Sequence, residues 1–465
     1  MKRFATFFLL VFLVMGAYAQ QAKYIFYFIG DGMGLNQVNG TEMFLAQSKD
    51  GTIGVQPLLF PSFPVVSYAT SFSQSNSVTD SAAAGTALAT GTKTYNGAIG
   101  VDPSKNPVES VAIKAKKAGK KVGITTTVSV DHATPSAFYA HQDNRNWYYE
   151  IAHDLAKADL DFVGGSGFLK PKTDKNGKDA PDVIPTIKEA GYTIAHGVKD
   201  YEAKKAQAKR MILIEREGWT AGSLNYAIDQ SGEDLTLSQI VESAINFLDN
   251  KKGFFIMAEG GKIDGGGHAN DVATTFKEVV DMDNAIKVAY EFYKKHPKET
   301  LIVVTADHET GGLSLCANSE YILHLDALKY QTSSIDVLSR KITDLRKAGT
   351  TSWEDVKALL SKEMGMWSQY PISWEQEKML RDSYEDTFVK RNQKFDENMY
   401  SRQEALAGVA KKVLAEYAHI SWASGSHSAA YVPVYAIGAG SNLFQGKLDN
   451  TDIPKKLAQA GGYKW

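Results

Sequence analysis

The chain has 465 residues, of which 22% are charged and 43% hydrophobic, and a formal net charge of −2. This length can bury a large core, either as one domain with insertions or as two or three smaller domains. The near-neutral charge offers no electrostatic reason to bind nucleic acid, because nucleic-acid-binding proteins usually carry a basic patch. Cys316 is the single cysteine, so an intrachain disulfide is excluded.

Residues 1–19 have the pattern of a secretory signal peptide. A basic start at residues 1–3 precedes an apolar stretch at residues 4–16 and a small-x-small site at residues 17–19. The alternative is a membrane anchor, but the stretch is shorter than the roughly 20 residues that a spanning helix needs. We expect cleavage after Ala19 and a periplasmic or secreted mature protein, residues 20–465, without a stable membrane anchor.

Short apolar runs alternate with helix-patterned stretches along the mature chain. Strand-like runs occur at residues 23–29, 65–70, 122–130, 211–215, 254–259, 301–305 and 432–437. Helical patterns occur at residues 108–118, 237–250 and 273–293. This alternation predicts an α/β fold with a mostly parallel central sheet and helices on both faces.

Two segments interrupt the alternation. Residues 166–208 are rich in Lys, Asp and Gly and are expected to form a surface excursion. Residues 317–420 are charge-rich and helical in pattern, and capping-box patterns at Thr351–Glu354 and Ser373–Gln376 open two of the helices. We interpret this second segment as a helical cap or interface element, inserted before the last strand.

Carboxylates and imidazoles follow three of the apolar runs. Asp31 lies in Gly-Asp-Gly-Met-Gly after the first run, Glu259 ends a later run that leads to Asp264 and His268, and Asp307-His308 follows a third. Gly-Asp-Gly alone also forms ordinary turns. Because ligands of parallel sheets sit beyond the carboxyl ends of the strands, the repetition predicts one site for several metal ions.

Ser81 opens an Ala-rich helical stretch after a serine-rich loop. Thr79, Asp80 or Ser81 could simply cap that helix. A nucleophile at a helix N-terminus, however, gains amide donors and a positive dipole that suit phosphate. No Gly-x-Ser-x-Gly elbow surrounds Ser81, so we expect a divalent ion to activate its hydroxyl.

Three histidines lie in contexts rich in Gly, Asp or Ser: His268, His308 and His427. Oxygen and imidazole ligands without cysteine suit zinc in a catalytic site. Arg145 follows His132 and Thr134 in the chain, and its planar guanidinium can hold two phosphate oxygens. Six other histidines are interpreted as structural, namely His141, His153, His196, His296, His324 and His419.

Taken in order, these motifs resemble those of the alkaline phosphatases over nearly the whole mature chain. The matching positions are Asp31, Thr79 to Ala83, His132 with Thr134 and Arg145, Glu259 with Asp264 and His268, Asp307 with His308, and His427. The resemblance implies a single catalytic domain, residues 20–465, with the helical segment inserted in it.

The resemblance also implies the roles of these residues. One Zn²⁺ would be held by Asp264, His268 and His427. A second Zn²⁺, beside the nucleophile Ser81, would be held by Asp31, Asp307 and His308. One Mg²⁺ would be held by Asp31, Thr134 and Glu259, with His132 beside it, and Arg145 would bind phosphate.

The implied activity is hydrolysis of small phosphate monoesters through a phosphoserine, by an exported enzyme for which the resemblance suggests a dimer. A phosphodiesterase or sulfatase of the same superfamily and a non-catalytic phosphate-binding protein are the alternatives. Two positions depart from the resemblance. His132 stands where some relatives have Asp, and Gly265 stands where others carry Lys or His. We expect a weaker preference for magnesium and easier release of phosphate.

Overall fold

The computed structural model describes residues 21–349, 352–392, 395–397 and 402–465. The predicted signal peptide, residues 1–19, lies outside these ranges, as does Thr351 of one predicted capping box. Within the described ranges, no helix is long and apolar enough to cross a membrane.

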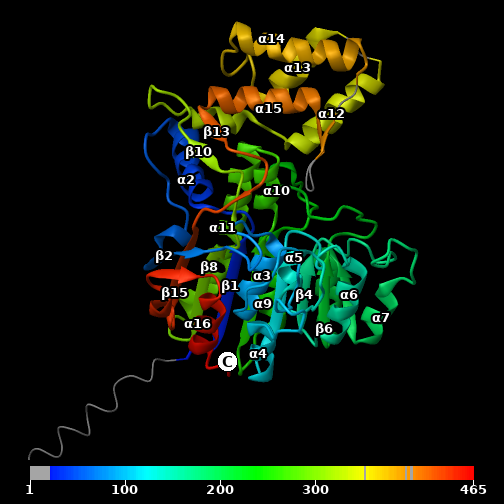
Figure 1. Ribbon diagram of the computed structural model, residues 1–465, viewed down its shortest axis with the longest axis vertical. Coiled ribbons are helices and arrows are strands. Elements are labelled where there is room, and N and C mark those ends of the chain that lie inside the picture. The colour runs from blue at the N-terminus through cyan, green and yellow to red at the C-terminus, as the bar shows by residue number, and fades with distance from the viewer. Residues whose placement is uncertain (1–20, 350–351, 393–394, 398–401) are drawn as a thin grey trace, which may run out of the picture.

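A twisted sheet of ten strands, counted over the described residues, forms the centre of the molecule (Figure 1). In spatial order the strands are β16 (Lys447–Asp449), β2 (Val65–Thr70), β15 (Val432–Gly438), β8 (Thr300–Ala306), β1 (Tyr24–Gly30), β7 (Phe254–Gly260), β3 (Lys121–Thr126), β4 (Phe162–Gly165), β6 (Arg210–Ile214) and β5 (Tyr192–His196). Strand β15 runs antiparallel to β2 and β8, whereas the other pairs are parallel. The predicted mostly parallel sheet is confirmed.

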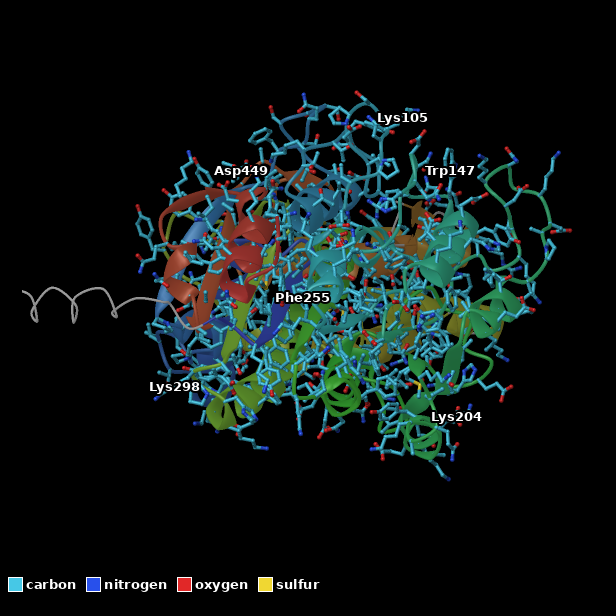
Figure 2. All side chains as sticks on the ribbon, turned by 90° about the horizontal axis from the view of Figure 1, so that it is seen from below. Lys105, Trp147, Lys204, Phe255, Lys298 and Asp449 are labelled. Carbon is cyan, nitrogen blue, oxygen red and sulfur yellow. The ribbon has the colours of Figure 1, made fainter. Side chains whose placement is uncertain are left out.

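The middle of the sheet is apolar on both faces. All seven residues of β1 are buried, as are those of β7 and β8 on either side. Such continuous apolar runs are typical of parallel strands that helices cover on both faces. Figure 2 shows Phe255 of β7 in the interior, whereas Lys105, Lys204 and Lys298 lie at the periphery.

Two groups of helices cover the sheet. Helix α9 (Leu237–Leu248) packs against α11 (Val272–Lys295), and α16 (Asp452–Gly461) packs against α3 (Ser81–Thr90) and α4 (Val111–Lys117). The other helices of this region are α2 (Leu35–Asp50), α5 (Ala133–Ser136), α6 (Tyr148–Lys157), α7 (Val183–Glu189), α8 (Gly197–Lys204) and α10 (Lys262–His268), with short 3₁₀ turns η1 (Phe60–Ser62), η2 (Ala227–Asp229) and η5 (Ser441–Phe444).

The prediction for residues 166–208 is wrong for the second half of that segment. Residues 183–204 form α7, β5 and α8, and β5 pairs in parallel with β6 at the edge of the central sheet. The short run Tyr192–His196 buries Tyr192, Ile194 and Ala195 between charged flanks. Those flanks dominate the local composition, which therefore hides a strand of the sheet.

Residues 325–417, called here the helical segment, lie beyond the carboxyl ends of the parallel strands (Figure 1). The segment contains η3 (Leu325–Tyr330), α12 (Ile335–Lys347), α13 (Trp353–Met364), α14 (Trp374–Tyr384), the π-turn η4 (Glu385–Val389), the hairpin of β11 (Phe395–Glu397) and β12 (Arg402–Glu404), and α15 (Ala405–Tyr417). Its apolar core is separate from that of the sheet, but includes Phe44 of α2 and Phe276 of α11. These two helices therefore fasten the helical segment to the sheet region.

The starts of two helices test the capping patterns. Ser373 and Gln376 exchange both hydrogen bonds of a capping box at the start of α14, as predicted. At the start of α13 the N-cap is Ser352, whose hydroxyl accepts a hydrogen bond from the N–H of Asp355 (3.1 Å). Both helices thus begin at a serine that satisfies a free backbone N–H.

Two antiparallel pairs connect the helical segment back to the sheet. Strand β10 (Leu313–Leu315) pairs with β13 (Ile420–Trp422), so the two ends of the segment lie side by side. Strand β9 (Glu309–Thr310) then pairs with β14 (His427–Ser428), with His427 opposite Thr310. These pairings return the chain from the helical segment to the carboxyl end of β8.

Candidate active site

Three central strands place their carboxylates side by side. In the parallel register Ile29 of β1 lies opposite Glu259 of β7, and Gly30 lies opposite Ala306 of β8. Asp31 and Asp307 come directly after their strands, and Asp31 has ligand atoms within 4.8 Å of those of Glu259 on one side and of Asp307 on the other. All three carboxylates are fully buried. The spatial convergence expected from the three apolar runs is therefore present.

Helix α10 follows β7 and carries two further predicted residues on one face. Asp264 and His268 are four positions apart, and Nε2 of His268 lies 3.3 Å from Oδ2 of Asp264. Gly32 packs against this helix with a positive φ of 74°, and a Cβ at Gly32 would lie 2.8 Å from the Cα of Asp264. Only glycine meets both conditions, which explains the Gly-Asp-Gly sequence.

His427 reaches the same site through the β9–β14 pair. Its Nε2 atom lies 3.1 Å from Nε2 of His268 and 3.6 Å from Oδ1 of Asp264. Its ring stacks on that of His308 with 3.5 Å between the centroids, and its Nδ1 is 2.8 Å from the carbonyl oxygen of Thr79. Imidazole nitrogens this close, beside a carboxylate, form the kind of donor set that binds zinc.

Ser81 is the first residue of α3, and its fully buried hydroxyl lies 3.2 Å from Nε2 of His308. The helix cap is Asp80, which accepts a hydrogen bond from the N–H of Ala83 (3.0 Å). The expectation of a cap in this motif is therefore confirmed for Asp80. Ser81 itself faces the cluster of carboxylates and imidazoles.

Arg145 lies at the edge of this cluster, with 6% of its surface exposed. Its guanidinium donates to Oδ2 of Asp80 (3.1 Å) and lies 3.4 Å from Nε2 of His132. The backbone N–H of Arg145 bonds to the carbonyl of Gly97 (2.7 Å), which fixes the start of the side chain. The helix cap Asp80 thus also holds the predicted phosphate-binding arginine.

The ligand atoms fall into three groups, each with its atoms within 4.8 Å of one another. The groups are Asp264 with His308 and His427, Asp31 with Asp307 and His308, and Asp31 with His132 and Glu259. Thr134 is also buried, in the first turn of α5 that follows His132. The structure thus brings every predicted site residue into one region, and Asp31 and His308 each belong to two groups.

Three carboxylates of this region, unlike Asp264, lack part of the donors that buried charges require. Both oxygens of Asp31, Oε1 of Glu259 and Oδ2 of Asp307 are buried without a hydrogen-bond donor among the described residues. Burial, and then the neighbouring carboxylates, raise the pKa of Asp31 well above its usual value. Burial likewise raises the pKa of Glu259 to about 8 and that of Asp307 to about 7. Bound cations would remove this cost, so the donor set fits metal ions.

Two of the imidazoles, those of His308 and His132, have lowered pKa values, whereas the neighbouring Asp264 raises the pKa of His268. Burial, followed by the nearby His427, lowers the pKa of His308 well below its usual value. Burial, with the positive charge of Arg145, lowers the pKa of His132 to about 3. Both rings are therefore neutral at pH 7, which is the form of histidine that binds metals.

The space around Gly265 bears on the expected ease of phosphate release. A Cβ at this position would lie 2.6 Å from the hydroxyl oxygen of Tyr226. The Nζ atom of Lys262 lies over the ring of Tyr226, 3.4 Å from its centroid. A larger residue at position 265 would therefore have to displace Tyr226. This contact could not be predicted, because no sequence motif relates Tyr226 to α10.

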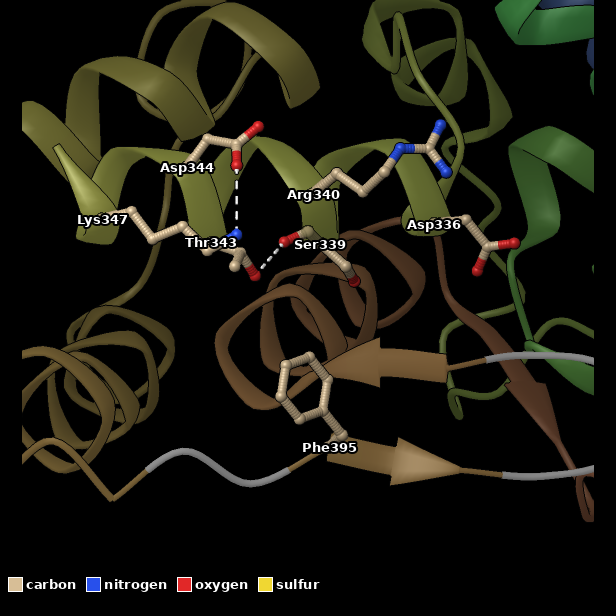
Figure 3. Close-up of a pocket in the computed structure, with 7 residues that line it drawn as sticks. All are labelled: Asp336, Ser339, Arg340, Thr343, Asp344, Lys347 and Phe395. Carbon is tan, nitrogen blue, oxygen red and sulfur yellow. Dashed lines mark hydrogen bonds and ion pairs between the residues drawn. The ribbon is translucent and has the colours of Figure 1, made fainter.

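A cavity of about 460 Å³ lies apart from the cluster, between α12 and β11 of the helical segment (Figure 3). The wall formed by α12 carries side chains of alternating charge, namely Asp336, Arg340, Asp344 and Lys347. Phe395 lies on the opposite side of the cavity. None of the predicted site residues lines this cavity. The chemistry predicted from the sequence therefore lies at the carboxyl ends of the strands.

Comparisons with known proteins agree with this arrangement. The family model of alkaline phosphatase matches residues 22–463. Alkaline phosphatase 3 of Bacillus subtilis (strain 168) is 31% identical over 455 residues, which cover 95% of this chain and 90% of the relative.

Solved structures show the same relationship. A cold-active alkaline phosphatase from a psychrophile, Shewanella sp., is 29% identical with a TM-score of 0.77, covering 94% of this chain and 99% of that one. The alkaline phosphatase of the Antarctic bacterium TAB5 is 28% identical with a TM-score of 0.66, covering 96% and 100%. A variant of the TAB5 enzyme, with the same identity, TM-score and coverage, has magnesium bound. The chain belongs to the alkaline phosphatase family of enzymes.

Proposed function

We propose that this chain hydrolyses phosphate monoesters, with Ser81 as the nucleophile. The observation that supports this most is the position of the Ser81 hydroxyl, 3.2 Å from Nε2 of His308 and next to three groups of metal-ligand atoms. The hydroxyl also lies at the N-terminus of α3, where free amides and the helix dipole favour an anionic group.

We propose two Zn²⁺ ions and one Mg²⁺ ion as cofactors. The first zinc would be held by Asp264, His268 and His427, the second by Asp31, Asp307 and His308, and the magnesium by Asp31, Thr134 and Glu259 beside His132. When bound, these ions would lower the pKa of the serine hydroxyl and of water and offset phosphate charge. The TAB5 variant that has magnesium bound carries a glutamate in place of a histidine, so it supports magnesium as the ion of a carboxylate site such as that of Asp31 and Glu259.

Ser81 and Arg145 would have different roles in the two steps of the reaction. In the first step Oγ of Ser81 attacks phosphorus, the ester P–O bond breaks, and the alcohol leaves with a proton. In the second step water attacks the phosphoserine, which releases inorganic phosphate and restores the Ser81 hydroxyl. The guanidinium of Arg145, held by Asp80, would bind two phosphate oxygens in both steps.

The test is to trap the phosphoenzyme. Wild-type protein incubated with labelled phosphate or phosphate ester and quenched in acid should carry label on Ser81, and Ser81→Ala should carry none. Ser77→Ala is the matched control, because this exposed serine lies four positions earlier in the same loop. Label on another residue in the wild type would contradict the assignment of Ser81.

The alternative substrates can be separated by rate. An alkaline phosphatase should hydrolyse an aryl phosphate monoester far faster than the matching diester or sulfate, and zinc with magnesium should restore activity after chelation. Faster hydrolysis of the diester or the sulfate would favour those superfamily activities, and no turnover at all would favour a binding protein.

We also propose that the protein is exported after cleavage behind Ala19 and forms a homodimer. N-terminal sequencing of the mature protein tests the cleavage site, and light scattering tests the oligomeric state. A mature protein that begins at Met1, or a monomer at all concentrations, would contradict these proposals.

A further inference from the structure

Thr310 lies at the centre of the site, although the sequence motifs did not single it out. It is fully buried, and its hydroxyl oxygen lies 2.5 Å from Oδ1 of Asp264 and 3.2 Å from Nδ1 of His308. Asp264 and His308 share the first group of ligand atoms, and His308 also belongs to the second group, with Asp31 and Asp307. One hydroxyl therefore contacts both groups.

A hydroxyl has one proton, and this limits the directions of its two hydrogen bonds. The ionised carboxylate of Asp264 can only accept, so Thr310 donates its proton to Asp264. Towards His308 the hydroxyl must then act as acceptor, which requires the proton of this neutral imidazole to be on Nδ1. The opposite nitrogen, Nε2, is left with a lone pair.

The lone pair of Nε2 faces the nucleophile and the second group. Nε2 lies 3.2 Å from Oγ of Ser81, 3.3 Å from Oδ1 of Asp31 and 3.3 Å from Oδ2 of Asp307. A proton on this nitrogen would occupy the position that a metal ion needs. The direction of the Thr310 hydrogen bond therefore decides whether His308 can be a ligand.

The surroundings of Thr310 hold its hydroxyl in place. Its N–H donates to the carbonyl of Gly32 (3.2 Å), and its own carbonyl accepts from the side chain of Gln37 (2.9 Å). It pairs with His427 in the β9–β14 ladder. On its other side Gly267 approaches so closely that a Cβ there would lie 3.0 Å from both Cβ and Cγ2 of Thr310.

We propose that Thr310 is a positioning residue that couples the two ligand groups: its hydroxyl orients Asp264 and selects the Nδ1–H tautomer of His308. The proposal rests on the ligand assignment given under the proposed function. It predicts that loss of the hydroxyl weakens metal binding in both groups, even though Thr310 itself binds no metal.

Three variants separate the hydroxyl from the packing of the side chain. Thr310→Val keeps the shape but removes the hydroxyl, whereas Thr310→Ser keeps the hydroxyl and removes the methyl group. Thr300→Val is the matched control, because Thr300 is buried at the opposite end of β8 and makes no side-chain hydrogen bond among the described residues. All three are compared as purified full-length protein, metal-free and after titration with zinc.

Zinc affinity is the first measurement. Thr310→Val should bind zinc about 10–100-fold more weakly than wild type, because loss of a hydrogen bond that orients a ligand typically has this effect. Thr310→Ser and Thr300→Val should remain within about threefold of wild type. Wild-type affinity in Thr310→Val, or an equal loss in Thr310→Ser, would overturn the proposal.

The tautomer of His308 is the second measurement and needs no variant. Nitrogen-15 NMR of the metal-free wild type should show His308 protonated at Nδ1, and Thr310→Val should show a mixture of tautomers. A proton on Nε2 in the wild type would overturn the proposal even if Thr310→Val failed to fold. Neither measurement involves turnover, so a failed phosphoserine experiment would contradict the proposed function and leave this result interpretable.

Discussion

The sheet region and the helical segment both bury carboxylates, but they compensate the charges differently. In the helical segment, Glu404 accepts hydrogen bonds from the N–H groups of Leu406 (2.8 Å) and Ala407 (3.1 Å) and forms an ion pair with Arg346. In the sheet region, both oxygens of Asp31 lack a donor among the described residues. A buried carboxylate with its own cation stabilises the fold, whereas buried carboxylates that face one another need an external cation.

Two arginines with largely buried side chains show the same contrast. Arg346 and Arg145 each have 7% of the side chain exposed, and each forms an ion pair with a carboxylate. Glu404, the partner of Arg346, is itself buried, and the guanidinium of Arg346 lies over the ring of Phe388, 4.7 Å from its centroid. Arg145 instead contacts Asp80 and His132, and Asp80 is the chain neighbour of Ser81, the proposed nucleophile.

The largest expected effect is that of Asp31→Asn, because Asp31 belongs to two ligand groups. Metal content should fall, and activity should fall by more than about 100-fold, the upper range for changes that only orient a ligand. The metal-free variant should nevertheless unfold at a higher temperature than the metal-free wild type, since asparagine removes the buried ionisable group. Elemental analysis and thermal unfolding test both parts; equal metal content would contradict the ligand role.

Glu404→Gln should have the opposite effects. It leaves the guanidinium of Arg346 buried without its carboxylate, and breaking a buried ion pair typically costs about 3–5 kcal/mol of unfolding free energy. Activity per folded molecule and metal content should stay at wild-type levels. Denaturant unfolding checks the stability. A loss of bound metal without a loss of stability would show that the helical segment belongs to the site.

Arg145→Ala is expected to weaken inhibition by inorganic phosphate about tenfold or more, because it removes hydrogen bonds from a charged donor worth about 1.5–3 kcal/mol each. Metal content should not change, and Arg145→Lys should recover part of the loss. Inhibition constants for phosphate supply the measurement. Unchanged inhibition would mean that Arg145, like Arg346, is a structural residue.

The pH dependence of stability is the smallest of the four effects. In the metal-free protein the pKa values of Asp307 and Glu259 are raised from 3.8 and 4.5 to about 7 and about 8. The folded state therefore holds protons that the unfolded state has released, and the contribution of these two carboxylates to stability falls as pH rises from about 4 to about 8. The neutral imidazoles of His132 and His308 act in the opposite direction, but only below about pH 6.5, where the unfolded state would protonate them. Thermal unfolding should therefore show a lower melting temperature at pH 8 than at about pH 6.5, with a larger gain from zinc at pH 8. A metal-free protein more stable at pH 8 would contradict this account.

The sequence predicted those parts of the site that depend on local patterns, such as an apolar run followed by a carboxylate. Apolar runs ending in Asp31, Glu259 and Asp307 indicated both the strands and the edge where their carboxylates meet. The run at residues 122–130 was placed correctly but is shorter than expected, because β3 ends at Thr126. Strand β5 was missed, because five residues between charged flanks carry little periodic signal.

Contacts between distant residues could not be predicted from local pattern. His268 and His427 are 159 positions apart, and their meeting depends on the β9–β14 pair that follows the helical segment. The same pair places Thr310 beside Asp264, although threonine after Asp307-His308 has no distinctive pattern. The Tyr226 hydroxyl next to Gly265 is likewise set by packing alone.

The distance along the chain between Asp31 and His427 determines when the candidate site can assemble during synthesis. A ribosome makes Asp31 early and His427 only near the end of the chain. Strand β1 also waits for its pairing partners β7 and β8, which follow it by more than two hundred residues. A nascent chain therefore lacks the complete candidate site, which forms only after synthesis, in the compartment where the finished chain folds.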